Sequence, residues 1–158
     1  LDGRIDCILQ GEATVIGLES TVVDCTSTEP TVLRLGAVSL ESLKKVVPET
    51  RLRGADGDGV ARSPGLKHKH YAPNARVVVV EAGTEIGGSD AAFIGIEQPT
   101  GAPRIVKICG SADEYAHALF AFFRECDKQD ISTIYCQTVE PAGIGAALMD
   151  RLRRAESR

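Results

Sequence analysis

The chain has 158 residues, of which 43% are hydrophobic and 25% charged, and its formal net charge is -4. This composition is typical of a globular protein, and the negative balance excludes an overall basic field that would attract nucleic acid or an anionic membrane. Every apolar run is shorter than the roughly 20 residues of a membrane-spanning helix. The first residue is Leu1 rather than Met, which suggests a fragment or a processed product.

The cysteines indicate a reducing environment. There are five, at positions 7, 25, 109, 126 and 136, an odd number without a C-x-x-C pair. Cys7, Cys109 and Cys136 fall within apolar, strand-like runs. The pattern therefore predicts buried, reduced thiols in the cytoplasm rather than a disulfide framework or a zinc site.

Short β-like runs characterise the first zone, residues 1–47. Their apolar residues predict strands over Ile5–Leu9, Ser20–Asp24 and Thr31–Arg34. A short helix is expected from Leu40 to Val47, because Ser39 is a suitable N-cap and a proline follows.

Glycine, proline and positive charge dominate the second zone, residues 48–74. It lacks apolar periodicity and carries the basic run Lys67-His68-Lys69-His70, which Pro64 and Pro73 frame. The pattern predicts a linker, and one of this length is either disordered or functional.

Strand and helix patterns alternate in the third zone, residues 75–158. The predicted strands are Val77–Val80, Ala91–Ile96, Ile105–Cys109 and Ile131–Cys136. The four-valine run is typical of a strand buried on both faces of a parallel sheet.

Two helices are expected in the same zone. The capping box Ser111–Glu114 opens the first, and an apolar stripe follows it, made of Tyr115, Leu119, Phe122, Phe123 and Cys126. The second carries Ile144, Leu148 and Leu152 four residues apart, with Arg151, Arg153 and Arg154 near its C-terminal end. The order of elements predicts a small, open, mostly parallel α/β sheet.

Two segments of the first zone carry polar groups that suit an anionic ligand. Ser20 and Thr21 offer adjacent hydroxyls at the start of an apolar strand, after Gly17, which permits a tight turn. The hydroxyls either donate to phosphate or carboxylate oxygens or bond only to the backbone. Arg34, two residues before Gly36, is either a phosphate clamp or a surface cation before a turn.

The linker is a third candidate. Lys67, His68 and His70 would attract a polyphosphate, and Tyr71 could stack or hydrogen-bond beside it. The alternative is a solvated, charged linker. The two histidines do not predict a metal site, because no nearby cysteine or carboxylate completes one. The phosphate-binding fingerprints G-x-x-x-x-G-K-[ST] and G-x-G-x-x-G are missing.

Three segments, taken in order along the chain, resemble motifs of the long-form threonylcarbamoyl-adenylate synthases. They are Gly-x-Glu-Ser-Thr-Val-Val-Asp (17–24), Leu-Arg-x-Gly (33–36) and Ser-Pro-Gly-x-Lys-x-x-His-Tyr-Ala-Pro (63–73). The resemblance covers essentially the whole chain and is only architectural beyond Ala75. It implies a fold of three parts: the end of a YrdC-like catalytic α/β domain (1–47), a linker or lid (48–74), and a small Rossmann-like domain with an open, mostly parallel sheet and flanking helices (75–158).

The resemblance also implies a function. Such an enzyme is a cytoplasmic nucleotidyltransferase that makes threonylcarbamoyl-AMP and pyrophosphate from L-threonine, bicarbonate and ATP, and Mg²⁺ is implied only through ATP. A transferase complex then modifies tRNA, which this chain need not bind itself. By the same resemblance, Ser20 and Thr21 lie near the threonine and the phosphates, and Arg34 lies on the nucleotide phosphates. Lys67, His68, His70 and Tyr71 close over them and exclude water.

The sequence departs from the family pattern in two ways. Leu35 stands where the family has proline, so the turn after Arg34 lacks a fixed φ. The family's Lys-x-Arg and Ser-x-Asn motifs, which lie upstream in the catalytic domain, are missing, so we expect this chain alone to have no synthase activity. Two rivals remain: a non-catalytic Rossmann-like module whose basic tether serves a nucleotide, RNA or protein partner, and a carbamoyltransferase-type enzyme, against which the linker motif argues.

Overall fold

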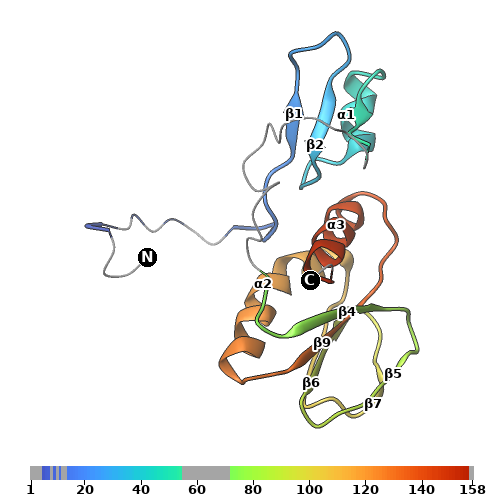
Figure 1. Ribbon diagram of the computed structural model, residues 1–158. Coiled ribbons are helices and arrows are strands. Elements are labelled where there is room, and N and C mark those ends of the chain that lie inside the picture. Colours follow the sequence, from blue (N-terminus) through green and yellow to red (C-terminus); the bar gives the residue numbers. More distant parts are fainter. Residues whose placement is uncertain (1–4, 8, 10, 12–13, 55–71, 157–158) are drawn as a thin grey trace.

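The computed structural model describes residues 5–7, 9, 11, 14–54 and 72–156, and these form two groups of elements (Figure 1). The first group contains a small sheet and one short helix, and the second contains a larger sheet with two helices. The last helix of the second group lies between the first group and the larger sheet (Figure 1). No helix in the described part of the chain is long and apolar enough to cross a membrane.

The first sheet has the strand order β1-β2-β3. Its strands are β1 Val22–Asp24, β2 Thr31–Arg34 and β3 Arg51–Leu52. β1 is antiparallel to β2, and β3 is parallel to β2. The helix α1, Leu40–Val46, begins as predicted, because the Ser39 side chain accepts from the Ser42 amide. None of its residues is buried by the described part of the chain.

Two expectations for the first two zones need correction. The described residues of the Ile5–Leu9 run form no strand, and Leu9 is 95% exposed. Cys7, expected to be buried there, is exposed. An apolar run becomes a strand only where a neighbouring strand takes its backbone hydrogen bonds, and the described chain offers this run no such neighbour. In the second zone, the sequence did not predict β3.

The second sheet has the order β4-β9-β6-β8, and all its neighbouring strands are parallel. Its strands are β4 Arg76–Val80, β6 Ala91–Gly95, β8 Ile105–Ile108 and β9 Thr133–Gln137. The two helices are α2 Ala112–Lys128 and α3 Ile144–Glu156. The predicted mixed α/β fold with a mostly parallel sheet and flanking helices is confirmed.

The larger core lies between this sheet and the two helices. The inward side chains of α2, among them the whole predicted stripe, are buried against alternate residues of the strands, such as Ile94, Ile134 and Cys136. The capping box is confirmed in its first half, because Ser111 accepts from the Glu114 amide. The Glu114 carboxylate instead accepts from the Gly110 amide.

The opposite face of the sheet carries a smaller cluster around Ile86, Ala91 and Phe93. Ile86 belongs to a two-stranded parallel sheet, β5 Glu85–Ile86 and β7 Thr100–Gly101. The sequence did not predict these short strands, because two residues carry no periodicity.

The four-valine run is an edge strand rather than a strand buried on both faces. β4 pairs only with β9, and of its valines only Val77 is fully buried. On its open edge, the Val79 amide donates to the Glu156 carboxylate at 2.8 Å. This side chain from the end of α3 occupies a backbone donor that an edge strand otherwise exposes to other chains.

Candidate functional site

The pairing of β1 with β2 brings two of the predicted site residues together. Arg34 is the last residue of β2, and Ser20 lies just before β1. The Arg34 Nε donates to the Ser20 carbonyl oxygen at 3.0 Å, and Nη2 lies 3.4 Å from the Ser20 hydroxyl oxygen. A guanidinium and an exposed hydroxyl side by side are suited to a phosphate or carboxylate group.

Thr21 is engaged with the backbone. Its hydroxyl donates to the Val38 carbonyl oxygen at 2.7 Å and accepts from the Val38 amide at 3.1 Å. These bonds tie the start of β1 to the turn before α1. The backbone role considered for Thr21 is therefore present, and a ligand role for this hydroxyl stays a prediction.

Gly36 explains why a glycine follows Arg34 so closely. A Cβ at this position would lie 2.5 Å from the Ser20 carbonyl carbon, and nearer still to the Thr21 nitrogen and the Glu19 oxygen. All three are backbone atoms, which cannot rotate away as a flexible side chain does. The Leu-Arg-x-Gly segment therefore lies directly on the Glu-Ser-Thr segment, and this close contact requires glycine.

Arg151 of α3 joins the same two segments, although the sequence assigned it no role. Its Nε donates to the Glu19 carboxylate at 2.7 Å, and its Nη2 donates to the Leu35 carbonyl oxygen at 2.8 Å. Its Nη1 donates to Asp150. The Arg151 side chain is only 8% exposed, so it is a buried charge with three partners. No local pattern could have found it, because Glu19 is 132 positions away.

The ion pair changes the titration of Glu19. Burial acts to raise the pKa of Glu19, but the hydrogen bond from Arg151, a backbone hydrogen bond and the charges of Arg151 and Arg34 outweigh it. The pKa of Glu19 therefore lies below its ordinary value, and the carboxylate is ionised at neutral pH.

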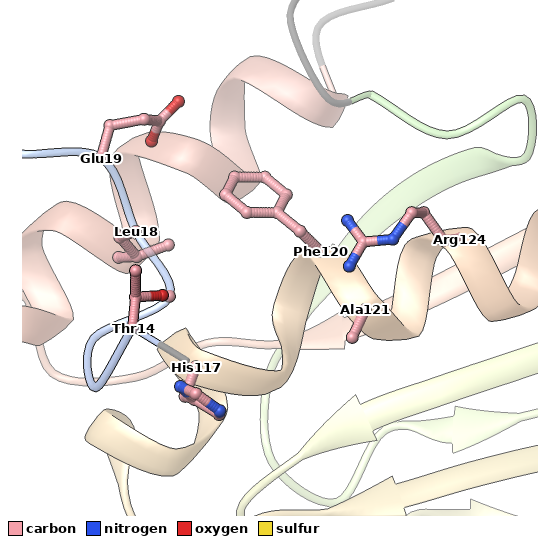
Figure 2. Close-up of a pocket in the computed structure, with 8 residues that line it drawn as sticks. Thr14, Leu18, Glu19, His117, Phe120, Ala121 and Arg124 are labelled. Atoms are coloured by element: carbon pink, nitrogen blue, oxygen red, sulfur yellow. The ribbon is translucent and has the colours of Figure 1, made fainter. Parts of the chain in front are cut away.

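A second contact between the first and third zones lies beside an open pocket of about 490 Å³. Gly17 has φ 61°, and a Cβ there would lie 2.5 Å from the His117 Cα on α2. Figure 2 shows Thr14 and Leu18 on the early segment, with Phe120 and Arg124 of α2 across from them. Ser20, Thr21 and Arg34 do not line this pocket.

The remaining predicted site residues, Lys67, His68, His70 and Tyr71, lie outside the described residues. Within the described ranges, no group of three His, Cys, Asp or Glu residues could hold a metal ion. Burial raises the pKa of Cys126 to about 12, with Asp127 and Glu125 adding to the shift. Burial also raises the pKa values of Cys109 and Cys136. These three thiols are protonated at neutral pH and are poor nucleophiles.

The Gln137 side chain bonds two backbone amides at the carboxyl end of the second sheet. Open parallel α/β sheets place their ligands beyond the carboxyl ends of the strands. Here Gln137, at the end of β9 and 4% exposed, accepts through Oε1 from the amides of Ile96 and Glu97, at 2.7 and 2.9 Å. These amides after β6 are the donors that an anion would use, and Gln137 occupies both.

Comparison with known proteins gives consistent matches. The family described as "Threonylcarbamoyl-AMP synthase, C-terminal domain" matches residues 38–157. The chain is 36% identical over 170 residues to the threonylcarbamoyl-AMP synthase of Pyrococcus abyssi, which covers 97% of this chain and 50% of that protein. It is 31% identical over 172 residues to the Bacillus subtilis protein of the same name, covering 98% of this chain and 50% of the relative.

Solved structures agree with the sequence matches. P. abyssi Sua5 in complex with L-threonine has a TM-score of 0.82 at 32% identity, covering 98% of this chain and 50% of the other. A variant of the same protein, with an adjacent His–Tyr pair changed to alanine, has a TM-score of 0.82 at 33% identity and covers 99% and 50%. The chain thus spans about half the length of the relatives it matches.

Proposed function

The chain belongs to the family of the threonylcarbamoyl-AMP synthase C-terminal domain, and we propose that it forms the second half of an L-threonylcarbamoyladenylate synthase. In this proposal, residues 1–47 complete the YrdC-like catalytic domain, residues 48–74 close over the substrates, and residues 75–158 form the C-terminal domain. The whole enzyme converts L-threonine, bicarbonate and ATP into threonylcarbamoyl-AMP and pyrophosphate in the cytoplasm, for the modification of tRNA by a separate transferase.

The observation that carries this proposal is the meeting of Ser20 with Arg34. The reaction transfers a nucleotidyl group, and its transition state and pyrophosphate leaving group are strongly anionic. A guanidinium held by two hydrogen bonds to Ser20 is oriented before substrate arrives, which is the property that electrostatic catalysis needs. We propose that Arg34 binds the nucleotide phosphates and that Ser20 binds a phosphate or the threonine. Thr21 supports them through its hydrogen bonds to Val38 and lies near the substrates in this proposal.

The linker supplies the second part of the proposed site. Lys67, His68 and His70 would add positive charge near the triphosphate. Tyr71 would cover the intermediate and exclude water, because water hydrolyses its mixed anhydride. His70-Tyr71 is the only His–Tyr pair in this sequence, and such a pair is the one altered in the solved P. abyssi variant. It is therefore the first pair to substitute here. Any Mg²⁺ would arrive with the phosphates of ATP.

The rival function, a nucleotide-binding Rossmann-like module, is disfavoured by Gln137. A nucleotide at the carboxyl end of β6 and β9 would need the amides that this side chain already bonds. Calorimetry with ATP on a chain starting at Ala75, after circular dichroism has shown that it is folded, would distinguish the two. We expect no binding, whereas micromolar binding would favour the rival.

The test of the synthase proposal compares the chain alone with a fusion that places the first half of the P. abyssi relative before Leu1. Pyrophosphate release should require L-threonine, bicarbonate and ATP together, and we expect it from the fusion but from neither half alone. Arg34→Met in the fusion should lower kcat/KM by about tenfold or more, the effect of one lost charged hydrogen bond. Lys45→Met, which removes an exposed cation of α1, is the matched control. Turnover by the 158-residue chain alone would refute the proposed division of the site.

A further inference from the structure

The third zone contacts the proposed site through one buried arginine. Arg151 lies in α3, in the last turns of the described chain, and bonds Glu19 and Leu35. Glu19 immediately precedes Ser20, and Leu35 immediately follows Arg34. The same guanidinium therefore bonds a direct neighbour of each residue that the proposed function depends on.

The bond from Arg151 to Glu19 joins the charged groups of α3 to the first zone. A buried guanidinium needs a counter-charge, and Asp150, next to it on the same helix, already supplies one. Asp150 also bonds Arg154 at 3.0 Å, so the helix carries its own ion network. Asp150 is thus shared between two arginines, and Glu19, from the segment that leads into β1, supplies the second carboxylate that balances them.

The planar shape of the side chain matters for the geometry. Arginine presents its donors in a rigid fork, so bonds to Glu19 and Leu35 fix the direction of both segments at once. The segments are also pressed together at Gly36 and joined by the bonds from Arg34 to Ser20. Arg151 holds this arrangement through its bonds to Glu19 and Leu35.

We propose that Arg151 is a positioning residue, through which the C-terminal domain holds Ser20 and Arg34 in the orientation that nucleotide binding requires. This inference rests on the proposed function and gives the C-terminal domain a role in it. Loss of the fork should leave the domain's own core intact, because that core is built on side chains such as Leu119, Ile134 and Leu148. It should loosen the two segments of the first zone.

The test begins with amide hydrogen exchange on the full chain and needs no activity. Arg151→Met should speed exchange in β1 and β2 by about tenfold or more, while α2 and β6 keep wild-type protection. Arg151→Lys keeps the charge but lacks the fork, so its exchange rates in β1 and β2 should lie between those of the wild type and Arg151→Met. Arg153→Met removes an exposed arginine two positions along the same helix and should change nothing. Wild-type exchange in β1 and β2 of Arg151→Met would overturn the inference.

Kinetics of the fusion then separate positioning from stability. With Arg151→Met we expect KM for ATP to rise by about tenfold at a temperature where circular dichroism shows the variant folded, with Arg151→Lys intermediate and Arg153→Met unchanged. Unchanged KM and kcat in Arg151→Met, despite faster exchange, would overturn the positioning role. An inactive wild-type fusion would instead overturn the proposed function, and the exchange data alone would then decide whether Arg151 holds the two segments.

Discussion

Replacing Gly36 with alanine tests how closely the two motif segments of the first zone depend on each other. The added Cβ would meet three backbone atoms of residues 19–21, at 2.5 Å or less. Overpacking of this kind costs about 1–3 kcal/mol, and the upper part of that range applies because backbone cannot rotate aside. Removing a glycine also restricts the unfolded chain, which stabilises the folded state by about 0.4–1 kcal/mol. The net effect should be about 2 kcal/mol, or about 30-fold in the local opening equilibrium.

Trypsin offers a direct assay, because the bond after Arg34 lies at the end of β2. Cleavage there needs local opening, and its rate follows the opening equilibrium when reclosing is fast. Mass spectrometry should show the Arg34–Leu35 cut appearing about 30-fold faster in Gly36→Ala than in the wild type. Gly87→Ala is the matched control, since a Cβ there meets no described atom within 4 Å. Equal cleavage rates in Gly36→Ala and the wild type would refute the close contact.

Three further predictions concern other parts of the structure. Glu19→Gln should lower the free energy of unfolding by about 1–3 kcal/mol at neutral pH. Because the pKa of Glu19 is lowered, its stabilisation is present above the ordinary carboxyl range and is lost as pH falls through its folded value. The stabilities of the two proteins should therefore converge as pH falls below the ordinary carboxyl range, and a difference that stays constant with pH would contradict the ion pair. Gln137→Leu should lower the free energy of unfolding by about 1–3 kcal/mol, because two backbone amides lose their acceptor. This loss should appear as a lower Tm, and an unchanged Tm would mean that water takes the place of the Gln137 oxygen. Iodoacetamide should label Cys7 and Cys25 in the folded chain and all five cysteines after unfolding, and labelling of a third thiol under native conditions would show that a buried site opens.

Local signals predicted much of the second group of elements. The α2 helix follows from its N-cap and its apolar stripe, because both act within a few residues and the core accepts the same face that the pattern marks. β2 and α1 were placed correctly for similar reasons. The strand predicted for Ile5–Leu9 was wrong, because a strand needs a partner strand and no local pattern shows whether one exists.

The candidate site was predictable only in part. The motifs pointed to Ser20 and Arg34, and the β1–β2 pairing brings them together. Arg151 could not be found in the same way, because a buried arginine and a helix-end arginine look alike in a sequence. The difference lies in tertiary contacts with Glu19 and Leu35, which only the folded chain reveals. Backbone bonding of Thr21 was one of the two alternatives that the sequence left open, and only the folded chain identifies Val38 as its partner.

The Arg151–Glu19 pair has a consequence for how the protein is made. Synthesis proceeds from Glu19 toward Arg151, and 132 positions separate them. At ribosomal speeds of about 5–20 residues per second, the earlier residue emerges on the order of ten seconds before its partner exists. During that interval β1 and β2 can pair but cannot be fastened to the later helix. The nascent chain therefore acquires this attachment only after α3 has been made, and any pause in translation before α3 prolongs the time for which the first sheet is exposed to chaperones and proteases.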